Sequence, residues 1–241
     1  MGCVQVLFCL SILVGTHLIH GKELCTITDN ECVTKEAQKA FNVFVPGIKG
    51  LIDPSDPLYL KQVDGVVPIP YRLSNLTLTG LQQCHITKLR INSKDLTYQY
   101  DLQCPHLLLN YHHKVKGLLD TVEIDTDGLA TITFDDYIFK INGKYGRLVS
   151  EKDQQLHFYL NGFTLETEPR GNVICNSLSP LHSDKRKSDI ARIYINEHSK
   201  DIEKFLKSPT MEKFMEKYLG NLDLYLRNFL FEVQYPETNT V

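Results

Sequence analysis

Residues 97–104 read TYQYDLQC, and apolar and polar side chains alternate along the whole stretch. In an extended chain, successive side chains point to opposite faces of a sheet. One face would carry the apolar side chains of Tyr98, Tyr100, Leu102 and Cys104. The other would carry the polar side chains of Thr97, Gln99, Asp101 and Gln103. This pattern predicts a β-strand with one buried face and one exposed face.

The same alternation continues on both sides of this stretch, from residue 66 to about residue 168. It is clear in YIFKI (137–141) and in LHFYL (156–160). Turn-forming residues separate the alternating segments, at residues 92–95, 125–128, 142–143 and 161–162. Strands joined by short turns pair in antiparallel order, and one sheet alone must curve strongly to cover its own apolar face. We therefore predict a strongly curved antiparallel meander over this region.

The turn at residues 92–95 determines how Cys84 and Cys104 lie relative to each other. If this turn is the centre of a hairpin, Ile86 faces Leu102 and Cys84 faces Cys104. Cysteines directly opposite each other on two strands are close enough for a cross-strand disulfide. A bulge in either strand would shift this pairing by one residue, which leaves the disulfide open as an alternative to free thiols.

A helical period replaces the alternation after Ser188. Apolar residues then recur three or four positions apart, as one face of a helix requires. They are Ile190, Ile193, Tyr194, Ile202, Phe205 and Leu206, followed beyond Ser208 and Pro209 by Met211, Phe214, Met215, Tyr218, Leu219, Leu222, Tyr225, Leu226 and Phe229. These side chains either pack on the sheet as a solid core or also line an elongated interior, and periodicity alone does not separate the two possibilities.

The first 21 residues contain no Lys, Arg, Asp or Glu, and residues 4–14 form an apolar run that is too short to span a bilayer. This combination predicts a secretory signal peptide at residues 1–21, followed by a single domain at residues 22–241. The chain carries 26 basic and 29 acidic side chains, a net charge of −3. Such a balance gives no electrostatic reason to expect nucleic acid or an anionic membrane as a partner.

Cys25 and Cys32 lie in the segment LCTITDNEC (24–32), just ahead of a predicted helix that begins near Thr34. A redox pair prefers two intervening residues, and a zinc site needs two more ligands nearby, which this segment lacks. In an oxidising compartment the pair is therefore predicted to form a disulfide at the start of the helix, with the Thr34 hydroxyl as the cap. Cys175 is either a free buried thiol or the partner of one of the hairpin cysteines.

The common catalytic and cofactor motifs are missing from the sequence. There is no G-x-S-x-G, H-E-x-x-H, P-loop or G-x-G-x-x-G pattern, and residues 125–128 lack the later ligands of a calcium loop. His112 and His113 are adjacent and would point to opposite faces of a strand, so they are poorly placed to bind one metal ion. We therefore expect no enzymatic activity, cofactor or metal. Asn75 begins an Asn-Leu-Thr sequence and is the predicted N-glycosylation site.

The order of segments along the chain is distinctive. The cysteine pair and a helix are followed by VPGIKGLIDPSDPLYL (45–60), LSNLTLTGLQQCHITKLRIN (73–92), YQYDLQCPHLLLNYHHKVKGLL (98–119), DTDGLATITFDDYIFKINGKY (125–145) and a helical finish. This order resembles the takeout and haemolymph juvenile-hormone-binding protein family of insects. The resemblance implies an α+β fold in which a highly curved antiparallel sheet wraps one long C-terminal helix, as in half of a bactericidal/permeability-increasing (TULIP) barrel. It also implies an internal hydrophobic tunnel and the disulfide between Cys25 and Cys32.

One feature departs from the juvenile-hormone carriers of that family. Their second disulfide joins a cysteine at the position of Cys175 to one in the C-terminal helix, whereas residues 189–231 contain no cysteine. Cys84 and Cys104 are not part of that pattern either. The sequence therefore resembles a takeout-like member more than a hormone carrier.

The resemblance implies a secreted carrier of a hydrophobic small molecule, such as a juvenile hormone-like terpenoid or a fatty acid, in haemolymph or another extracellular fluid. We expect a monomer; a lipid-acting extracellular hydrolase and a module that binds a receptor or a membrane surface stay open as alternatives. The side chains expected to line the tunnel are Phe41, Phe44, Val45, Ile48, Phe134, Tyr137, Phe139, Tyr145, Phe158, Tyr159, Phe205, Phe214, Tyr218 and Phe229. Among them, the hydroxyls of Tyr137, Tyr145 and Tyr159 are expected to orient a polar head group.

Overall fold

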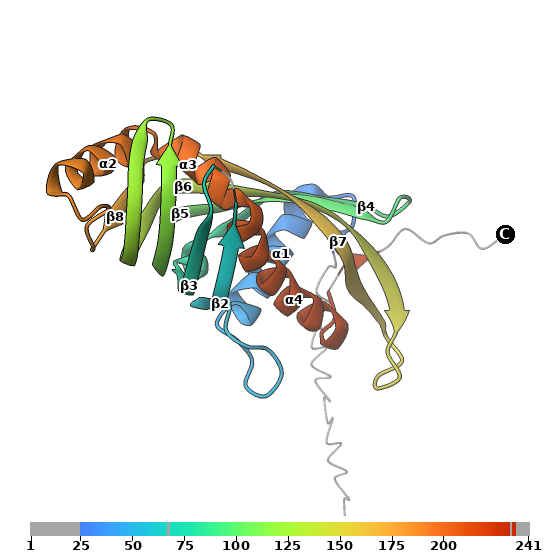
Figure 1. Ribbon diagram of the computed structural model, residues 1–241. Helices are drawn as coiled ribbons and strands as arrows, with labels where there is room; N and C mark the ends of the chain where they lie inside the picture. Colours follow the sequence, from blue (N-terminus) through green and yellow to red (C-terminus); the bar gives the residue numbers. More distant parts are fainter. Residues whose placement is uncertain (1–24, 67, 232, 235–241) are drawn as a thin grey trace, which may run out of the picture.

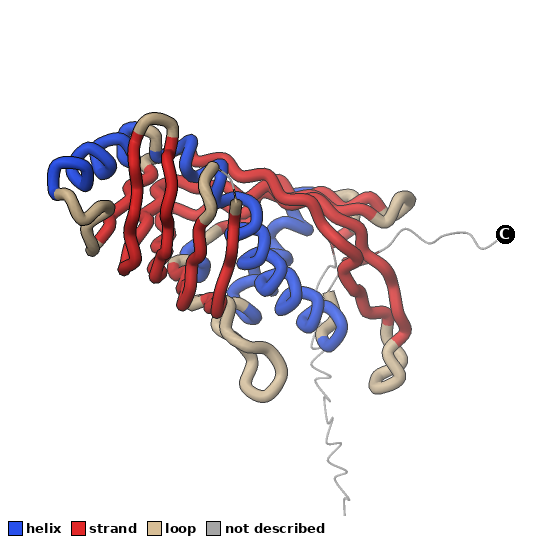
Figure 2. Tube along the Cα trace, viewed as in Figure 1, coloured by secondary structure: helices blue, strands red, loops and turns tan. Residues whose placement is uncertain are grey.

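The computed structural model describes residues 25–66, 68–231 and 233–234. The predicted signal peptide lies outside these residues. The largest unit of the described chain is one antiparallel sheet, and helices from both ends of the sequence pack against it (Figure 1). The strands bend along their length, so that the sheet is strongly curved (Figure 2). The predicted α+β fold with a curved antiparallel sheet is confirmed.

Two long neighbouring strands, β5 (Thr97–Leu119) and β6 (Val122–Val149), form the centre of the sheet. They pair over almost their whole length, because Thr97 lies opposite Lys144 and Leu119 lies opposite Val122. The other strands and one 3₁₀ helix are β1 (Cys25–Thr26), β2 (Leu58–Gly65), β3 (Tyr71–Thr79), η1 (Leu81–Gln83), β4 (His85–Asn92), β7 (Leu156–Pro169), β8 (Val173–Ser177) and β9 (Val233–Gln234). The order across the sheet is β2-β3-β5-β6-β7, with β4 paired to β5 and β8 paired to β6, while β1 and β9 form a separate parallel pair.

Three of the four predicted turns are wrong, because their residues lie inside the long strands. Residues 125–128 belong to β6, and the chain turns instead at Asp120, which has a φ of 53°. Residues 142–143 lie in β6 next to residues 161–162 in β7. The pairing shifts there by one residue, and Gly162 has a φ of 74°. The Asn-Gly pairs therefore mark a β-bulge, a conformation that demands the same backbone freedom as a turn.

The predicted turn at residues 92–95 is confirmed and joins β4 to β5. The predicted pairing holds at the start of β4, and the disulfide between Cys84 and Cys104 is present. Closer to the turn, a bulge at Lys88, which has a φ of 55°, shifts the pairing by one residue. Cys175 is free and buried, which settles the alternative that the sequence left open.

The predicted long C-terminal helix is divided into α2 (Lys185–Glu197), α3 (Ser199–Leu206) and α4 (Glu212–Asn228). A π-helical turn, Lys207–Met211, joins α3 to α4 and contains Pro209. Proline has no backbone N–H to donate, which explains why the regular α-helix ends at this point. The helix α4 crosses the sheet between β2 and β7, whereas α2 covers the end of the sheet at β8 (Figure 1).

The N-terminal helix α1 (Asn30–Phe44) begins earlier than predicted. Its cap is Asp29, whose carboxylate accepts a hydrogen bond from the Cys32 N–H at 3.0 Å. The prediction of Thr34 as the cap is therefore wrong. The disulfide between Cys25 and Cys32 is present, and it connects the first turn of α1 to β1.

Asn75, the predicted glycosylation site, lies on the surface of β3. Its side chain is exposed, its φ is 51°, and the pairing of β3 with β5 is irregular at this point. The Asn75 side-chain oxygen accepts a hydrogen bond from the Tyr59 hydroxyl at 3.1 Å. The site is thus accessible, and glycosylation stays a prediction. Within the described ranges, no helix is long and apolar enough to cross a membrane.

Candidate functional site

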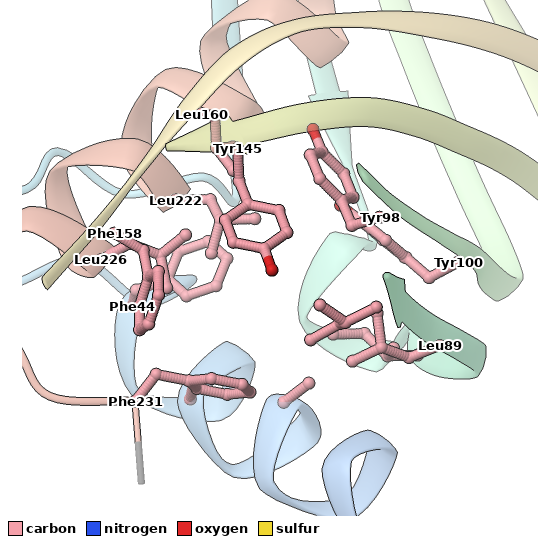
Figure 3. A pocket seen from close by; sticks show the side chains of 14 residues that line it. Phe44, Leu89, Tyr98, Tyr100, Tyr145, Phe158, Leu160, Leu222, Leu226 and Phe231 are labelled. Carbon is pink, nitrogen blue, oxygen red and sulfur yellow. The ribbon is translucent and has the colours of Figure 1, made fainter. Parts of the chain in front are cut away.

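An apolar cavity of about 100 Å³ lies where α1, β4, β7 and the C-terminal half of α4 meet (Figure 3). The 14 side chains that line it belong to Ala37, Ala40, Phe44, Ile86, Leu89, Ile91, Tyr98, Tyr100, Tyr145, Phe158, Leu160, Leu222, Leu226 and Phe231. None of these side chains is charged, and tyrosine hydroxyls are the only polar groups among them. A lining of this kind suits an apolar guest with a single polar group.

The helical walls of the cavity follow from local sequence patterns. Ala37 and Ala40 lie about one turn apart on the same face of α1. Their small side chains leave space that larger residues would fill. Leu222 and Leu226 lie one turn apart on α4 and face the same space from the other side. Alternation along β4 and β5 supplies the remaining apolar side chains in the same way.

Hydrogen bonds hold both helices in place beside the cavity. The Gln38 side chain of α1 accepts the backbone N–H of Ile86 at 2.6 Å, which fixes α1 to β4. The Asp223 carboxylate of α4 accepts the backbone N–H of Leu160 at 2.7 Å, which fixes α4 to β7. Asp223 is also paired with Arg227 at 2.7 Å. Ile86 and Leu160 themselves line the cavity, so each bond fixes one helix next to a lining residue.

Two tyrosine hydroxyls beside the cavity have no hydrogen-bond partner in the described part of the chain, those of Tyr98 and Tyr145. The side chains are 8% and 7% exposed. The Tyr98 hydroxyl lies against the backbone of Gly143, where an added Cβ would be 2.6 Å away. Burial, together with the nearby Asp223 carboxylate, raises the pKa of Tyr98 to about 12. The Tyr145 ring points into the space enclosed by the lining side chains (Figure 3), so its hydroxyl is the one available to a guest.

A second cavity, of about 140 Å³, lies at the opposite end of β5 and β6, next to α2 and α3. No residue lines both cavities. Five aromatic side chains on β6 and α4 have 0% exposure and belong to neither lining: Phe134, Tyr137, Phe139, Phe214 and Tyr218. We call these five side chains the aromatic barrier. In the part of the interior that the structure describes, the lengthwise tunnel implied by the resemblance corresponds to these two cavities, whose linings share no residue.

The structure distributes the residues predicted to line a tunnel over several environments. Those that line the first cavity are Phe44, Tyr145 and Phe158. The one that lines the second cavity is Phe205. Those buried in the core are Phe41, Val45 and the five members of the aromatic barrier. Those that are half-buried outside both linings are Ile48, Tyr159 and Phe229.

Of the three tyrosines expected to orient a head group, only Tyr145 lines a cavity. The Tyr137 hydroxyl donates a hydrogen bond to the Glu203 carboxylate, and both side chains are buried. The Tyr159 ring lies under the Arg227 guanidinium, 5.0 Å from its centroid. Neither Tyr137 nor Tyr159 lines the first or the second cavity, and the role expected of their hydroxyls stays a prediction.

Most residues that line the first cavity were not among those predicted from the sequence to line a tunnel. The missed residues are Ala37, Ala40, Ile86, Leu89, Ile91, Tyr98, Tyr100, Leu160, Leu222, Leu226 and Phe231. Two signals point to part of this set. Tyr98 and Tyr100 share the buried face of β5 with Cys104. Ala37 and Ala40 place small side chains on the inner face of α1, where a packed core would favour larger ones.

The two adjacent histidines on β5 point to opposite faces of the sheet, as predicted. His112 lies outside and contacts the Asp127 carboxylate at 3.2 Å. His113 lies inside and is 4% exposed. Over the described residues, no group of three or more His, Cys, Asp and Glu side chains is placed to hold a metal ion.

The sequence matches the family model of the haemolymph juvenile hormone binding protein over residues 3–235. Among solved structures, the crystal structure of Takeout 1 from Epiphyas postvittana has the same fold, with a TM-score of 0.80. The two sequences are 19% identical, and the match covers 86% of this chain and 96% of that chain. A comparison with curated protein sequences finds no match. The chain belongs to the haemolymph juvenile hormone binding protein family.

Proposed function

We propose that this chain is a secreted carrier that binds a hydrophobic small molecule in the cavity between α1, β4 and α4. The observation that carries the proposal is the lining, which consists of uncharged side chains and presents the Tyr145 hydroxyl to a guest. The family description names a hormone as the ligand of its members. The two disulfides suit an oxidising, extracellular compartment.

Removal of apolar surface from water would supply most of the affinity. Each buried methylene contributes about 0.8 kcal/mol, offset in part by the freedom that both molecules lose on association. An engineered cavity of about 150 Å³ in another protein holds one benzene molecule. The present cavity of about 100 Å³ is smaller, so a terpenoid or a fatty acid has to move lining side chains apart. The side chains expected to move are those that are only partly buried, among them Leu222, Leu226 and Phe231.

The Tyr145 hydroxyl would orient the polar end of the ligand. A tyrosine hydroxyl both donates and accepts a hydrogen bond. A carbonyl, ester, epoxide or carboxylate oxygen placed beside it would accept a hydrogen bond from this hydroxyl. A buried hydroxyl without a partner is unfavourable, so this bond would favour ligands with one such oxygen over pure hydrocarbons.

Tryptophan in place of Leu222 is expected to fill the cavity and to raise the Kd of an apolar fluorescent probe, N-phenylnaphthylamine, by about tenfold or more. The added ring occupies space that the probe needs, and tenfold corresponds to losing the burial of about two methylenes. The matched control is Leu224→Trp, on the same helix but on its outer face, where Leu224 is 40% exposed. Fluorescence titration measures both, and far-UV circular dichroism checks that both are folded.

Equal Kd values for Leu222→Trp, Leu224→Trp and the parent chain would show that the probe binds elsewhere. Native mass spectrometry of the protein secreted from cells provides an independent test of the carrier function. We expect a copurified apolar molecule or uptake of added probe. A chain that is empty and takes up no apolar molecule would contradict the proposal.

A further inference from the structure

The second cavity differs in chemistry from the first. Its wall is mostly aliphatic, but it also includes the side chains of His113 on β5, Thr126 on β6 and Arg192 on α2. Tyr71 of β3 lines it too, and its buried hydroxyl has no hydrogen-bond partner in the described part of the chain. His113 is 4% exposed and Thr126 is 6% exposed. A buried imidazole beside an open cavity raises the question of which ring atom faces a guest, and in which protonation state.

Two hydrogen bonds determine where the proton of the His113 ring lies. The His113 Nε2 atom is 3.1 Å from the Thr126 Oγ1 atom. The Thr126 hydroxyl donates to the carbonyl oxygen of Pro180 at 2.9 Å. A threonine hydroxyl has a single proton, and a carbonyl oxygen only accepts. Both contacts are hydrogen bonds only if Nε2 carries the ring proton and donates it to Thr126.

The segment that carries the Pro180 carbonyl is itself held in place. The backbone N–H of Asp125 donates to the Leu181 carbonyl at 3.0 Å. The backbone N–H of Leu181 donates to the Ser188 hydroxyl of α2 at 2.9 Å. The Pro180 acceptor is thus fixed between β6 and α2, and the direction of the whole chain of bonds is fixed with it.

The Nδ1 atom of His113 is consequently a bare acceptor. It is buried, and it has no hydrogen-bond partner among the residues that the structure describes. Burial, and then the neighbouring His112, lower the pKa of His113 below its usual value, which favours the neutral ring. A neutral ring with its proton on Nε2 offers a guest one lone pair and no proton.

We infer that the second cavity binds an apolar molecule that carries a hydroxyl group, with the hydroxyl donating a hydrogen bond to the Nδ1 atom of His113. The chemical class is a lipid alcohol: a terpenoid, sterol or fatty alcohol. An ester or ether of the same size has only acceptor oxygens and cannot make this bond. The inference therefore concerns a different site from the proposed function, and either can fail without the other.

The test compares two probes that have the same number of heavy atoms, n-octanol and methyl heptyl ether. It uses the full chain with Leu222→Trp, which fills the first cavity, and with Tyr71→Phe, which removes the tyrosine hydroxyl from the second cavity. Calorimetric titration is expected to show that the alcohol binds about fivefold more tightly than the ether, the effect of one net hydrogen bond. His113→Phe is expected to abolish this preference. The matched control, His112→Phe on the outer face of the same strand, is expected to retain it.

A spectroscopic readout covers the case in which His113→Phe does not fold. In the His113 ring, the nitrogen chemical shifts should identify Nε2 as the protonated atom, and octanol, but not the ether, should shift Nδ1. Thr126→Val removes the acceptor of the Nε2 proton, and is expected to weaken the preference for the alcohol. Two results would overturn the inference. One is equal binding of alcohol and ether by the test chain in which His113 is kept, and the other is a His113 ring protonated on Nδ1.

Discussion

Replacing Tyr218 with alanine is expected to lower the free energy of unfolding by about 3–5 kcal/mol, the range typical of large aromatic side chains removed from a core. Tyr218 belongs to the aromatic barrier and is 0% exposed. Its ring centroid lies 6.2 Å from that of Phe41 and 5.7 Å from that of Phe44. The ring therefore fills the junction between α1, α4 and the sheet, and its removal would leave a hole that these rigid elements cannot close.

Tyr218→Phe separates the contribution of the ring from that of the hydroxyl. The Tyr100 hydroxyl donates to the Tyr218 hydroxyl over a long distance of 3.4 Å, so the loss of this bond is expected to cost about 1 kcal/mol. Urea unfolding followed by far-UV circular dichroism measures both variants. A Tyr218→Ala chain as stable as Tyr218→Phe would show that the middle of the interior is not tightly packed. The division into two cavities would then be wrong.

Removing the disulfide between Cys84 and Cys104 is expected to lower the free energy of unfolding by about 3 kcal/mol. The bridge joins residues 20 positions apart, and it restricts the unfolded chain accordingly. Both cysteines should be replaced by alanine, because they are 1% and 0% exposed and serine would bury a hydroxyl. Urea unfolding under non-reducing conditions provides the measurement.

The matched control replaces Cys25 and Cys32, which lie seven positions apart, and is expected to cost about 2 kcal/mol because the closed loop is shorter. Burial raises the pKa of the Cys175 thiol to about 12, so it stays protonated and is a poor partner for disulfide exchange. Peptide mapping of the parent protein should find Cys84 linked to Cys104. A peptide that links either of them to Cys175 would contradict the structure of the hairpin.

The sheet could be predicted from the sequence because its signal is local. Alternation over residues 97–104 assigned Tyr98, Tyr100 and Cys104 to one face, and all three are buried. The disulfide of the hairpin was one of the alternatives that the same alternation and one turn allowed, and it is present. These features depend only on neighbouring residues and on the period of an extended chain.

The turns and the helix ends were harder to predict because different backbone geometries use the same residues. Gly162 has the positive φ that a hairpin turn requires, yet it sits in a bulge inside β7. Asp29 and Thr34 are both good helix caps, and only the fold decides that Asp29 reaches the backbone of the first turn. Pro209 lies between the two halves of the helical pattern, but the pattern does not specify the π-helical turn that joins α3 to α4 there.

The cavities could not be predicted because they depend on the contacts between distant elements. Alternation places Tyr137 and Tyr145 on the inner face of β6 alike. Tyr137 is covered by α3, where the Glu203 carboxylate accepts a hydrogen bond from the Tyr137 hydroxyl. Tyr145, in contrast, faces the cavity next to α1 and α4. The same inner face is thus filled in its middle and hollow near its ends. Sequence periodicity contains no information about which positions a helix will cover.

The claim that the cavity beside Tyr145 is the binding site is tested most directly by NMR of a complex with lauric acid. We expect nuclear Overhauser contacts between the methylene protons of the ligand and the rings of Phe44, Tyr145 and Phe158, all of which line this cavity. A complex whose ligand contacts only residues outside this lining, and leaves these three ring signals unshifted at saturation, would contradict the account.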